Sequence, residues 1–396
     1  MATRDGTIGG RRPGEDPAAA VVTTAALRSG RLAEWFDRQA RTLFIMPAVV
    51  MILIFSIFPL IATFILSLSR VRLRGGGYTM RYVGARNYEK QIFGSEQWHF
   101  LGTFEEVSVL GWVVTAAGAG LLAWWLVKYL RGRSGRVSVV GTIGRLITAS
   151  VLFGLTFMFA ATLFSGTRLG TLGVTLFYVV VGCGIQFLIG LGLAVLCAQP
   201  IRGRTFFRVV FFLPMMVTPI GIGFTFRMMA DTGKGPFAPI WQWIGLGDFA
   251  WAVNPWTARA FIIVGDSWQW IPFIFVVLLA ALENVPRDLV EAGHVDGAGG
   301  WQIFREITWP QIVPVAATVM LIRVIEGFKL VDLPNMMTGG GPGIATESMT
   351  LHSFFAWRAL DPAQSAAISY LLLFVTVVLC VSYFMLVVRK RAAVHG

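Results

Sequence analysis

Four ionisable residues recur at three-residue intervals within one long apolar run: Arg323, Glu326, Lys329 and Asp332. Charged side chains are costly inside a membrane-spanning segment and are expected to pair with one another or to line a polar path. Neighbouring members of this set lie about one helical turn apart, so opposite charges can form ion pairs. Two interpretations stay open: a polar stripe that lines a path or faces a partner subunit, or internal salt bridges that only satisfy charge.

Three further polar residues are weaker candidates for such a path. Asp266 and Gln269 lie one turn apart in the preceding apolar run, and Asn335 follows the charged set. The amide of Asn335 has the donor and acceptor groups needed to contact a hydroxyl. Trp268 and Trp270 offer rings for stacking, although tryptophan near a membrane more often serves as an interfacial anchor or as packing.

The sequence shows no constellation for nucleophilic, metal or redox chemistry. The three cysteines lie in apolar runs without ligand spacing, so we expect no metal site and no bound cofactor. Gly233-Lys234 is followed by Gly235 and lacks the upstream glycine of a phosphate-binding loop. Catalysis by this chain is therefore not expected.

The composition predicts an all-α polytopic membrane protein. Of the 396 residues, 56% are hydrophobic and 14% are charged, whereas soluble domains carry about 25% charged residues. Apolar runs of about 18 residues or more indicate membrane-spanning helices. We predict eight spans, at about 43–69, 109–130, 139–164, 170–197, 209–229, 259–282, 312–333 and 366–388.

A polar island at 283–310 separates two of these runs and is expected to fold as two short helices. Leu289, Ala292, Gly293 and Asp296 fall on one face of the first helix, with Asn284 as its cap. Gly297 is expected to break the chain there, because glycine readily adopts the conformation of a tight turn. The second short helix is expected to end at Pro310.

This island resembles the cytoplasmic coupling loop of binding-protein-dependent ABC importers. The family pattern is met by a set of residues from both predicted helices: Glu291, Ala292, Asp296, Gly297, Ala298, Trp301, Phe304, Ile307 and Pro310. Gly293 stands where a second alanine is usual, and Trp309 where leucine is usual. Segments elsewhere resemble the same family: Tyr82–Tyr88, Phe211–Pro214, Asp266–Pro272 and the glycine-rich Thr338–Gly343, which we interpret as a tight outer turn.

The resemblance implies a permease subunit of a carbohydrate importer of the maltose and glycerol-phosphate group. A dimer of ABC ATPase subunits would bind ATP and Mg, a second permease would complete the pathway, and an extracytoplasmic binding protein would deliver a sugar, oligosaccharide or polyol. The alternative is a secondary transporter that works without ATP, although we find no internal repeat of the kind such transporters often show. A membrane-embedded enzyme would need a catalytic cluster, which is missing from the sequence.

The resemblance also suggests how the chain is divided. We expect a basic cytoplasmic tail at 1–42, the first span and an outer loop at 43–108, an inserted helix pair at 109–168 and the permease core at 169–391. The core and the first span together give six spans, and the insertion adds two. Lys and Arg are enriched in the loops that this arrangement assigns to the cytoplasm, which favours cytoplasmic N- and C-termini in a bacterial inner membrane.

Overall fold

The computed structural model describes residues 44–103, 107–131, 139–164, 168–199 and 204–384. The predicted tail at 1–42 lies outside these ranges. The chain divides into two compact units between Thr63 and Phe64, and each is described by itself.

The described part of the first unit is an exposed apolar helix that continues into the second unit. The π-helical turn η1 (Leu53–Ile57) is followed by α2 (Phe58–Ser67). Pro59 lacks an amide hydrogen and its ring crowds the preceding turn, and the wider π turn just before it accommodates both effects.

Within the described residues, each of the eight predicted apolar runs contains helix, although not every run is one continuous span. Six described helices are long and apolar enough to cross a membrane: Phe44–Ser67, Val109–Lys128, Thr171–Ala198, Pro255–Glu283, Gly300–Phe328 and Pro362–Tyr383. A seventh span results if the bent pair Val209–Met216 and Pro219–Ala230 is counted as one. The remaining predicted run forms α6 (Val139–Phe164), which contains the apolar helical segment Arg145–Met158. The all-α membrane fold expected from the composition is confirmed.

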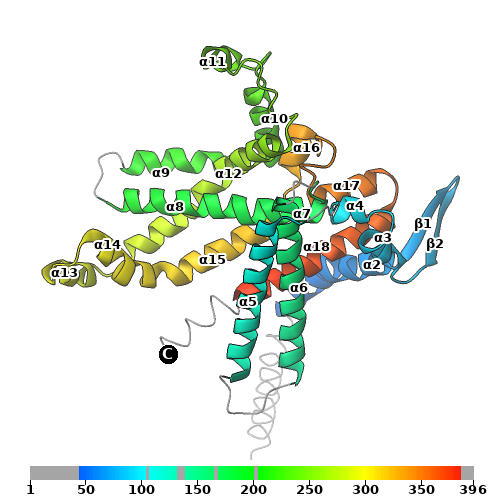
Figure 1. Cartoon of the computed structure of the whole chain (residues 1–396), viewed down its shortest axis with the longest axis horizontal. Helices are drawn as coiled ribbons and strands as arrows, with labels where there is room; N and C mark the ends of the chain where they lie inside the picture. The colour runs from blue at the N-terminus through cyan, green and yellow to red at the C-terminus, as the bar shows by residue number, and fades with distance from the viewer. Residues whose placement is uncertain (1–43, 104–106, 132–138, 165–167, 200–203, 385–396) are drawn as a thin grey trace, which may run out of the picture. The chain divides into compact units, whose positions relative to one another are not determined.

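The centre of the second unit is a packed group of helices around α12 (Pro255–Glu283). Figure 1 shows α8 (Cys183–Ala198) and α15 (Trp309–Phe328) beside it, and all three contact one another. Ile274, Phe275 and Leu278 of α12 are buried in one apolar cluster with residues of α8 and α15. At Gly190 a side-chain carbon would lie 2.7 Å from Ile274 Cγ2, so only glycine permits this approach of α8 to α12.

The span Thr171–Ala198 contains a π turn, and another segment is broken by a sharp bend. α7 (Thr171–Phe177) leads through the π turn η2 (Tyr178–Gly182) into α8. α9 (Arg204–Phe212) and the short turn η3 (Leu213–Met216) meet α10 (Pro219–Ala230) at a bend of 103°. Prolines at the starts of η3 and α10 remove amide donors and favour the break at this point.

The predicted insertion forms a helical hairpin. α5 (Val109–Arg131) packs along α6, and a side-chain carbon at Gly118 would clash with Thr156 across the pair. The C-terminal half of α6 contacts α7 and α18 (Pro362–Tyr383), with Leu155 and Ala160 buried.

A small β-hairpin follows the first span and was not predicted. β1 (Ser69–Arg74) pairs antiparallel with β2 (Gly77–Tyr82), and the turn contains Gly76 at a positive φ of 100°. The short helices α3 (Arg86–Ile92) and α4 (Gln97–Phe100) come next. Alternation of basic and apolar residues in 69–74 was the available signal for the strand.

The C-terminal part contains two more short helices before α18. The helix predicted at 312–333 in fact begins at Gly300 and ends at Phe328, so the predicted boundaries were wrong at both ends. α16 (Asp332–Thr338) and α17 (Met349–Arg358) follow, joined by the glycine-rich turn. A further short helix, α11 (Ala238–Trp243), lies between α10 and α12.

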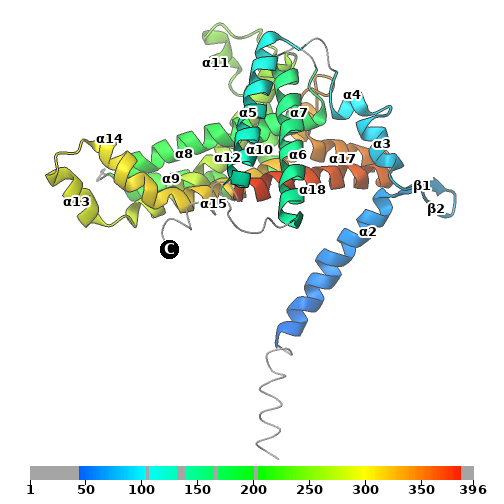
Figure 2. The ribbon, with the colours of Figure 1, turned by 60° about the horizontal axis from the view of Figure 1, so that its bottom comes forward.

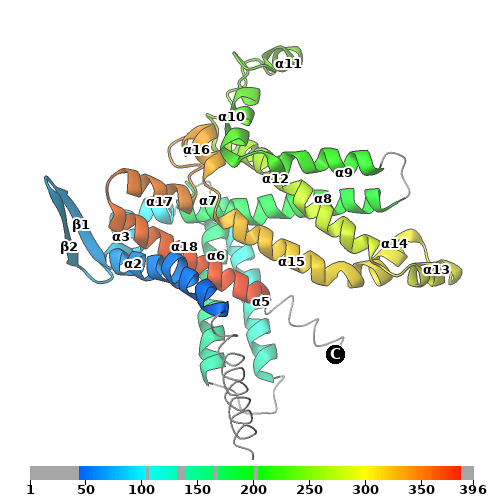
Figure 3. The ribbon, with the colours of Figure 1, turned by 180° about the vertical axis from the view of Figure 1, so that it is seen from behind.

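The two ends of the core helices carry different structures. Figure 2 shows α13 (Arg287–Val295) and α14 (Gly300–Ile303) at one end of α12 and α15, with α4 and α17 at the other end. The same arrangement is visible from behind in Figure 3.

Candidate functional site

The island at 283–310 folds as a tight turn between two helices. Gly297 has a φ of +76°, and its amide donates to the carbonyl of His294 at 3.1 Å. The amide of Ala298 donates to the carbonyl of Gly293 at 3.0 Å. This pair of bonds is a Schellman motif, in which a left-handed residue ends the helix and satisfies its last carbonyls. The predicted role of Gly297 in breaking the helix is confirmed by this geometry.

The two arms of the turn pack through Gly293. Gly293 is buried, and a side-chain carbon there would lie 2.9 Å from Ile307 Cδ1 and 3.3 Å from Ile303 Cγ1. The rings of Trp301 and Phe304 stack with centroids 5.6 Å apart. The close approach at Gly293 packs α13 and the following helix into one compact body.

The tip of this body exposes large apolar side chains. Val295 is 87% exposed and Trp301 is 74% exposed, and Ala292 and Asp296 are also exposed. Beside the tip, α8, α12 and α13 border a groove of about 620 Å³ that Glu291 lines. Apolar residues exposed among polar ones commonly mark a protein-binding surface.

Two local predictions for this island were wrong. The second helix does not end at Pro310, because the π turn η4 (Phe304–Thr308) continues into α15, where Pro310 is the second residue. The wider π turn just before Pro310 makes room for its ring and for its missing amide donor, so the proline does not terminate the helix. Asn284 does not cap α13; it follows α12, and its side-chain amide donates to the carbonyl of Ala280 at 2.7 Å.

A buried polar network joins the three central helices. Arg323 of α15 forms an ion pair with Asp266 of α12, and Gln186 of α8 donates to the same carboxylate oxygen at 2.8 Å. Arg323 also donates to the side-chain oxygen of Gln186, and its guanidinium lies 4.9 Å from the ring centre of Trp270. Arg323 is 1% exposed and Asp266 is 4% exposed. These groups therefore satisfy one another within the core.

The predicted stripe of charges is divided by this arrangement. Arg323 faces Asp266 rather than Glu326, whereas Lys329 donates to Glu326 at 2.5 Å in a partly exposed pair. α15 ends at Phe328, so Asp332 begins a separate helix. The helical period placed all four on one span, but the break after Phe328 removes that continuity.

The remaining pathway candidates lie near the end of the core helices opposite the turn at Gly297 or near a helix break. Gln269 donates to the carbonyl of Val217, at the bend between α9 and α10, at 3.4 Å. Asn335 of α16 lines a hollow together with Arg227 and Asp231. Gln269 and Asn335 thus contact different parts of the chain.

The segment Thr338–Gly343 forms a tight turn. Gly339, Gly340 and Gly343 all have positive φ. The hydroxyl of Thr346 bonds Thr338 at 2.7 Å and the carbonyl of Gly341 at 2.8 Å, which closes the turn.

Sequence reasoning missed the partners of the buried charges. Gln186 is fully buried, and Arg259 donates to the carbonyl of Ala345 at 2.6 Å while facing the ring of Trp256. A polar residue within an apolar run was the signal at Gln186, and the reasoning that identified Asp266 applies to it equally.

Comparison with known proteins agrees with this geometry. Residues 186–394 match the family described as "Binding-protein-dependent transport system inner membrane component". The trehalose/maltose transport system permease protein of Thermococcus litoralis is 32% identical over 198 residues, covering 50% of this chain and 67% of that protein. The sn-glycerol-3-phosphate transport system permease protein of Rhizobium meliloti is 28% identical over 236 residues, covering 59% and 80%.

A solved structure shares the fold. A bacterial ABC transporter involved in the import of the acidic polysaccharide alginate contains a chain that matches with a TM-score of 0.58 and 17% identity. The match covers 91% of the present chain and 99% of that chain.

Proposed function

The chain belongs to the family of binding-protein-dependent transport system inner membrane components, and from that premise we propose that it is the permease subunit of an ATP-driven importer for a sugar, oligosaccharide or polyol. The names of the trehalose/maltose and glycerol-phosphate relatives support this substrate class. A secondary transporter without an ATPase is not supported, because the matched family depends on a binding protein.

The proposed assembly has four kinds of component. A dimer of ABC ATPase subunits binds and hydrolyses ATP with Mg, so this chain carries no nucleotide and no metal for that step. A second permease completes the pathway, and an extracytoplasmic binding protein delivers the substrate. The family match supports the transport role. The ATPase, the second permease and the binding protein are the parts that our proposal adds to it.

We call the island at 283–310, with its turn at Gly297, the coupling turn. Its exposed apolar tip is the observation that carries the proposal. Val295 and Trp301 are highly exposed beside polar residues at the end of α12 and α15. Burying exposed apolar area stabilises a complex by about 25 cal/mol per Å² before the cost of association is counted. We assign this surface to the ATPase, with Glu291 and Asp296 available to pair with its cations.

The geometry of the turn supports a lever mechanism. Gly297 fixes the angle between the arms, and Gly293 holds them in contact. Because α13 follows α12 closely and the second arm continues into α15, displacement of the tip by the ATPase moves both spans. This rigid connection converts closure of the ATPase dimer into rearrangement of the pathway.

The expected placement in the membrane follows from this assignment. The coupling turn and both termini lie in the cytoplasm, and the turn at Thr338–Gly343 lies on the outer side of a bacterial inner membrane. We keep the boundaries between parts of the chain after residues 42, 108 and 168. The hairpin of α5 and α6 is an addition that packs beside the core. Gln269, Glu326, Lys329, Asp332 and Asn335 remain candidates for the substrate path, whereas Asp266 is assigned to the buried network.

The proposal is tested by purifying the tagged chain from its native membrane in mild detergent and identifying its partners by mass spectrometry. We expect a stoichiometric ATPase and a second permease. Val295→Asp should release the ATPase but retain the second permease. Val253→Asp is the matched control, because Val253 is 71% exposed and precedes α12 at the opposite end. A chain that purifies alone, or an equal loss of ATPase in both variants, contradicts the assignment.

A further inference from the structure

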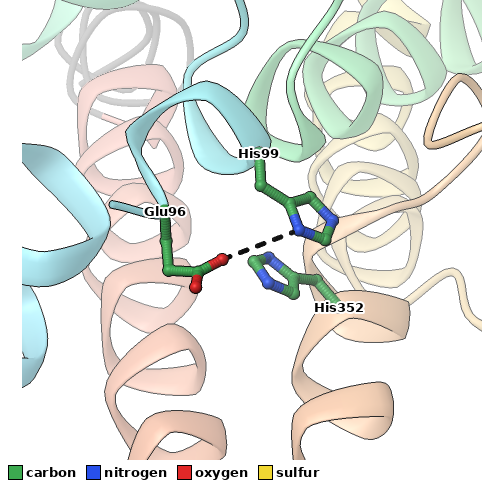
Figure 4. A group of neighbouring side chains, drawn as sticks. All are labelled: Glu96, His99 and His352. Carbon is green, nitrogen blue, oxygen red and sulfur yellow. Dashed lines mark ion pairs between the residues drawn. The ribbon is translucent and has the colours of Figure 1, made fainter. Parts of the chain in front are cut away.

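A second cluster of chemistry-bearing side chains lies at the end of the core opposite the coupling turn. Glu96 immediately precedes α4, His99 lies within α4, and His352 lies within α17. Figure 4 shows the three side chains converging from these two parts of the chain. One potential ligand atom from each residue lies within 4.8 Å of the other two. The imidazole rings of His99 and His352 stack with centroids 4.0 Å apart.

Two carboxylates flank the ring of His99. Its Nδ1 lies 4.0 Å from Glu96 Oε2, and its Nε2 lies 3.0 Å from Glu347 Oε1. Glu347 is 4% exposed, and its carboxylate is paired with the partly exposed His99. Metal-binding histidines usually have this arrangement, with one ring nitrogen toward the ion and the other held by a carboxylate or carbonyl.

The second histidine, His352, is buried, with 4% of its surface exposed. Its Nδ1 lies 3.4 Å from the hydroxyl of Thr171, which leaves Nε2 for another ligand. An imidazole binds a metal ion through a ring nitrogen that carries no proton.

We propose that Glu96, His99 and His352 bind a divalent transition-metal ion such as Zn²⁺, with Glu347 orienting His99. Two imidazoles and one carboxylate form a ligand set typical of zinc, with water as the fourth ligand. Ligand bonds of about 2.0–2.2 Å require donor atoms roughly 3.4 Å apart. The side chain of Glu96 is 27% exposed, so it can move toward the rings as the site closes around the ion. The two rings are nearly parallel in their stack, so they must also turn about their side-chain bonds until one nitrogen lone pair of each points at the ion.

Such an ion would connect two separate parts of the permease. α4 belongs to the segment after the first span, whereas α17 packs against α18 near the C-terminal end of the chain. A bound ion would therefore act as a staple between α4 and α17, at the far end of the core from the ATPase surface. This role does not depend on which substrate the permease carries.

The test measures zinc on the full chain purified with its partners through a tag that contains no histidine run. After dialysis against a chelator and titration with Zn²⁺, bound zinc is counted by elemental mass spectrometry, and thermal unfolding is followed with and without the ion. We expect the wild-type chain to bind about one Zn²⁺ more than the His99→Gln or His352→Gln variant. We also expect Zn²⁺ to raise the Tm of the wild-type chain. Replacing Zn²⁺ with Co²⁺ should give the visible absorption of a tetrahedral site.

Two further variants keep the result decisive. His294→Gln is the matched control, because it removes an exposed histidine from the coupling turn and should leave the zinc count unchanged. Glu96→Gln preserves the shape of the most exposed ligand, so it tests zinc binding even if the histidine variants fail to assemble. We expect its zinc affinity to fall at least about tenfold. Equal zinc affinity in wild type and Glu96→Gln, or no zinc-dependent change in Tm, would overturn the proposal.

Discussion

Arg323 on α15 and Asp266 on α12 form an ion pair in the centre of the membrane-spanning core, and both side chains are almost completely buried. Gln186 on α8 hydrogen-bonds both of them. Two charges removed from water are tolerated only when partners satisfy them. The pair therefore fixes how three helices meet.

Removing one member of this pair should be strongly destabilising. Arg323→Met leaves Asp266 as a buried unpaired carboxylate, and losses of about 3–5 kcal/mol are typical for such a change. The double variant Arg323→Met with Asp266→Leu removes both charges and should recover much of the stability. Thermal unfolding of the purified chain in detergent measures the difference. A double variant less stable than both single variants would contradict a mainly structural role.

The Glu326–Lys329 pair should behave differently. Both side chains are partly exposed, and exposed ion pairs contribute about 0–1 kcal/mol. Glu326→Gln and Lys329→Met should therefore leave Tm nearly unchanged. If these residues line the substrate path, uptake by the reconstituted transporter should still fall. A large loss of Tm would show instead that the pair supports the fold.

Close packing of α8 on α12 should depend on one glycine. A side-chain carbon at Gly190 would lie 2.7 Å from Ile274 Cγ2 and 3.3 Å from the backbone nitrogen of Phe275, whereas Gly192 has open space. Gly190→Leu should separate the helices and lower Tm, while Gly192→Leu should not. Both substitutions replace glycine with the same residue on one helix, so equal effects would argue against this contact.

The angle of the coupling turn should depend on the backbone at Gly297. Its positive φ disfavours any other residue by about 1–2 kcal/mol, although no atom would obstruct a side chain there. Gly297→Asp should therefore lower transport while assembly with the ATPase persists. Gly299→Asp is the control, because Gly299 also has open space but a negative φ of −69°. Full uptake by Gly297→Asp would exclude this turn as the lever.

Much of the fold was predictable because apolar length alone specifies membrane helices. Each of the eight predicted runs contains helix within the described residues, and Gly297 ends its helix as expected. The predicted helix boundaries were wrong where one helix forms both part of the coupling turn and a membrane span. Trp301 and Phe304 belong to the coupling turn, yet the same helix continues through Pro310 into the next span. A proline inside a helix is tolerated where the turn before it makes room for its ring, as the π turn η4 does here, and the local sequence did not reveal that turn.

The partners of charged residues were less predictable, because they are set by contacts between helices. The i,i+3 rule correctly paired Glu326 with Lys329. It also placed the partner of Arg323 on the same helix, whereas that partner is Asp266 on α12. The histidine cluster shows the same limit. His99 and His352 are far apart in the sequence and show no metal-ligand spacing, so only the packing of α4 near α17 brings them together.

The dependence of uptake on ATP tests the central claim most directly. The chain would be reconstituted into liposomes with its co-purified permease and ATPase, its binding protein added outside, and radiolabelled trehalose, maltose and glycerol 3-phosphate offered in turn. We predict accumulation of at least one substrate only when ATP is enclosed with the ATPase, and loss of that accumulation in Gly297→Asp but not in Gly299→Asp. Equal accumulation without ATP would contradict the importer mechanism.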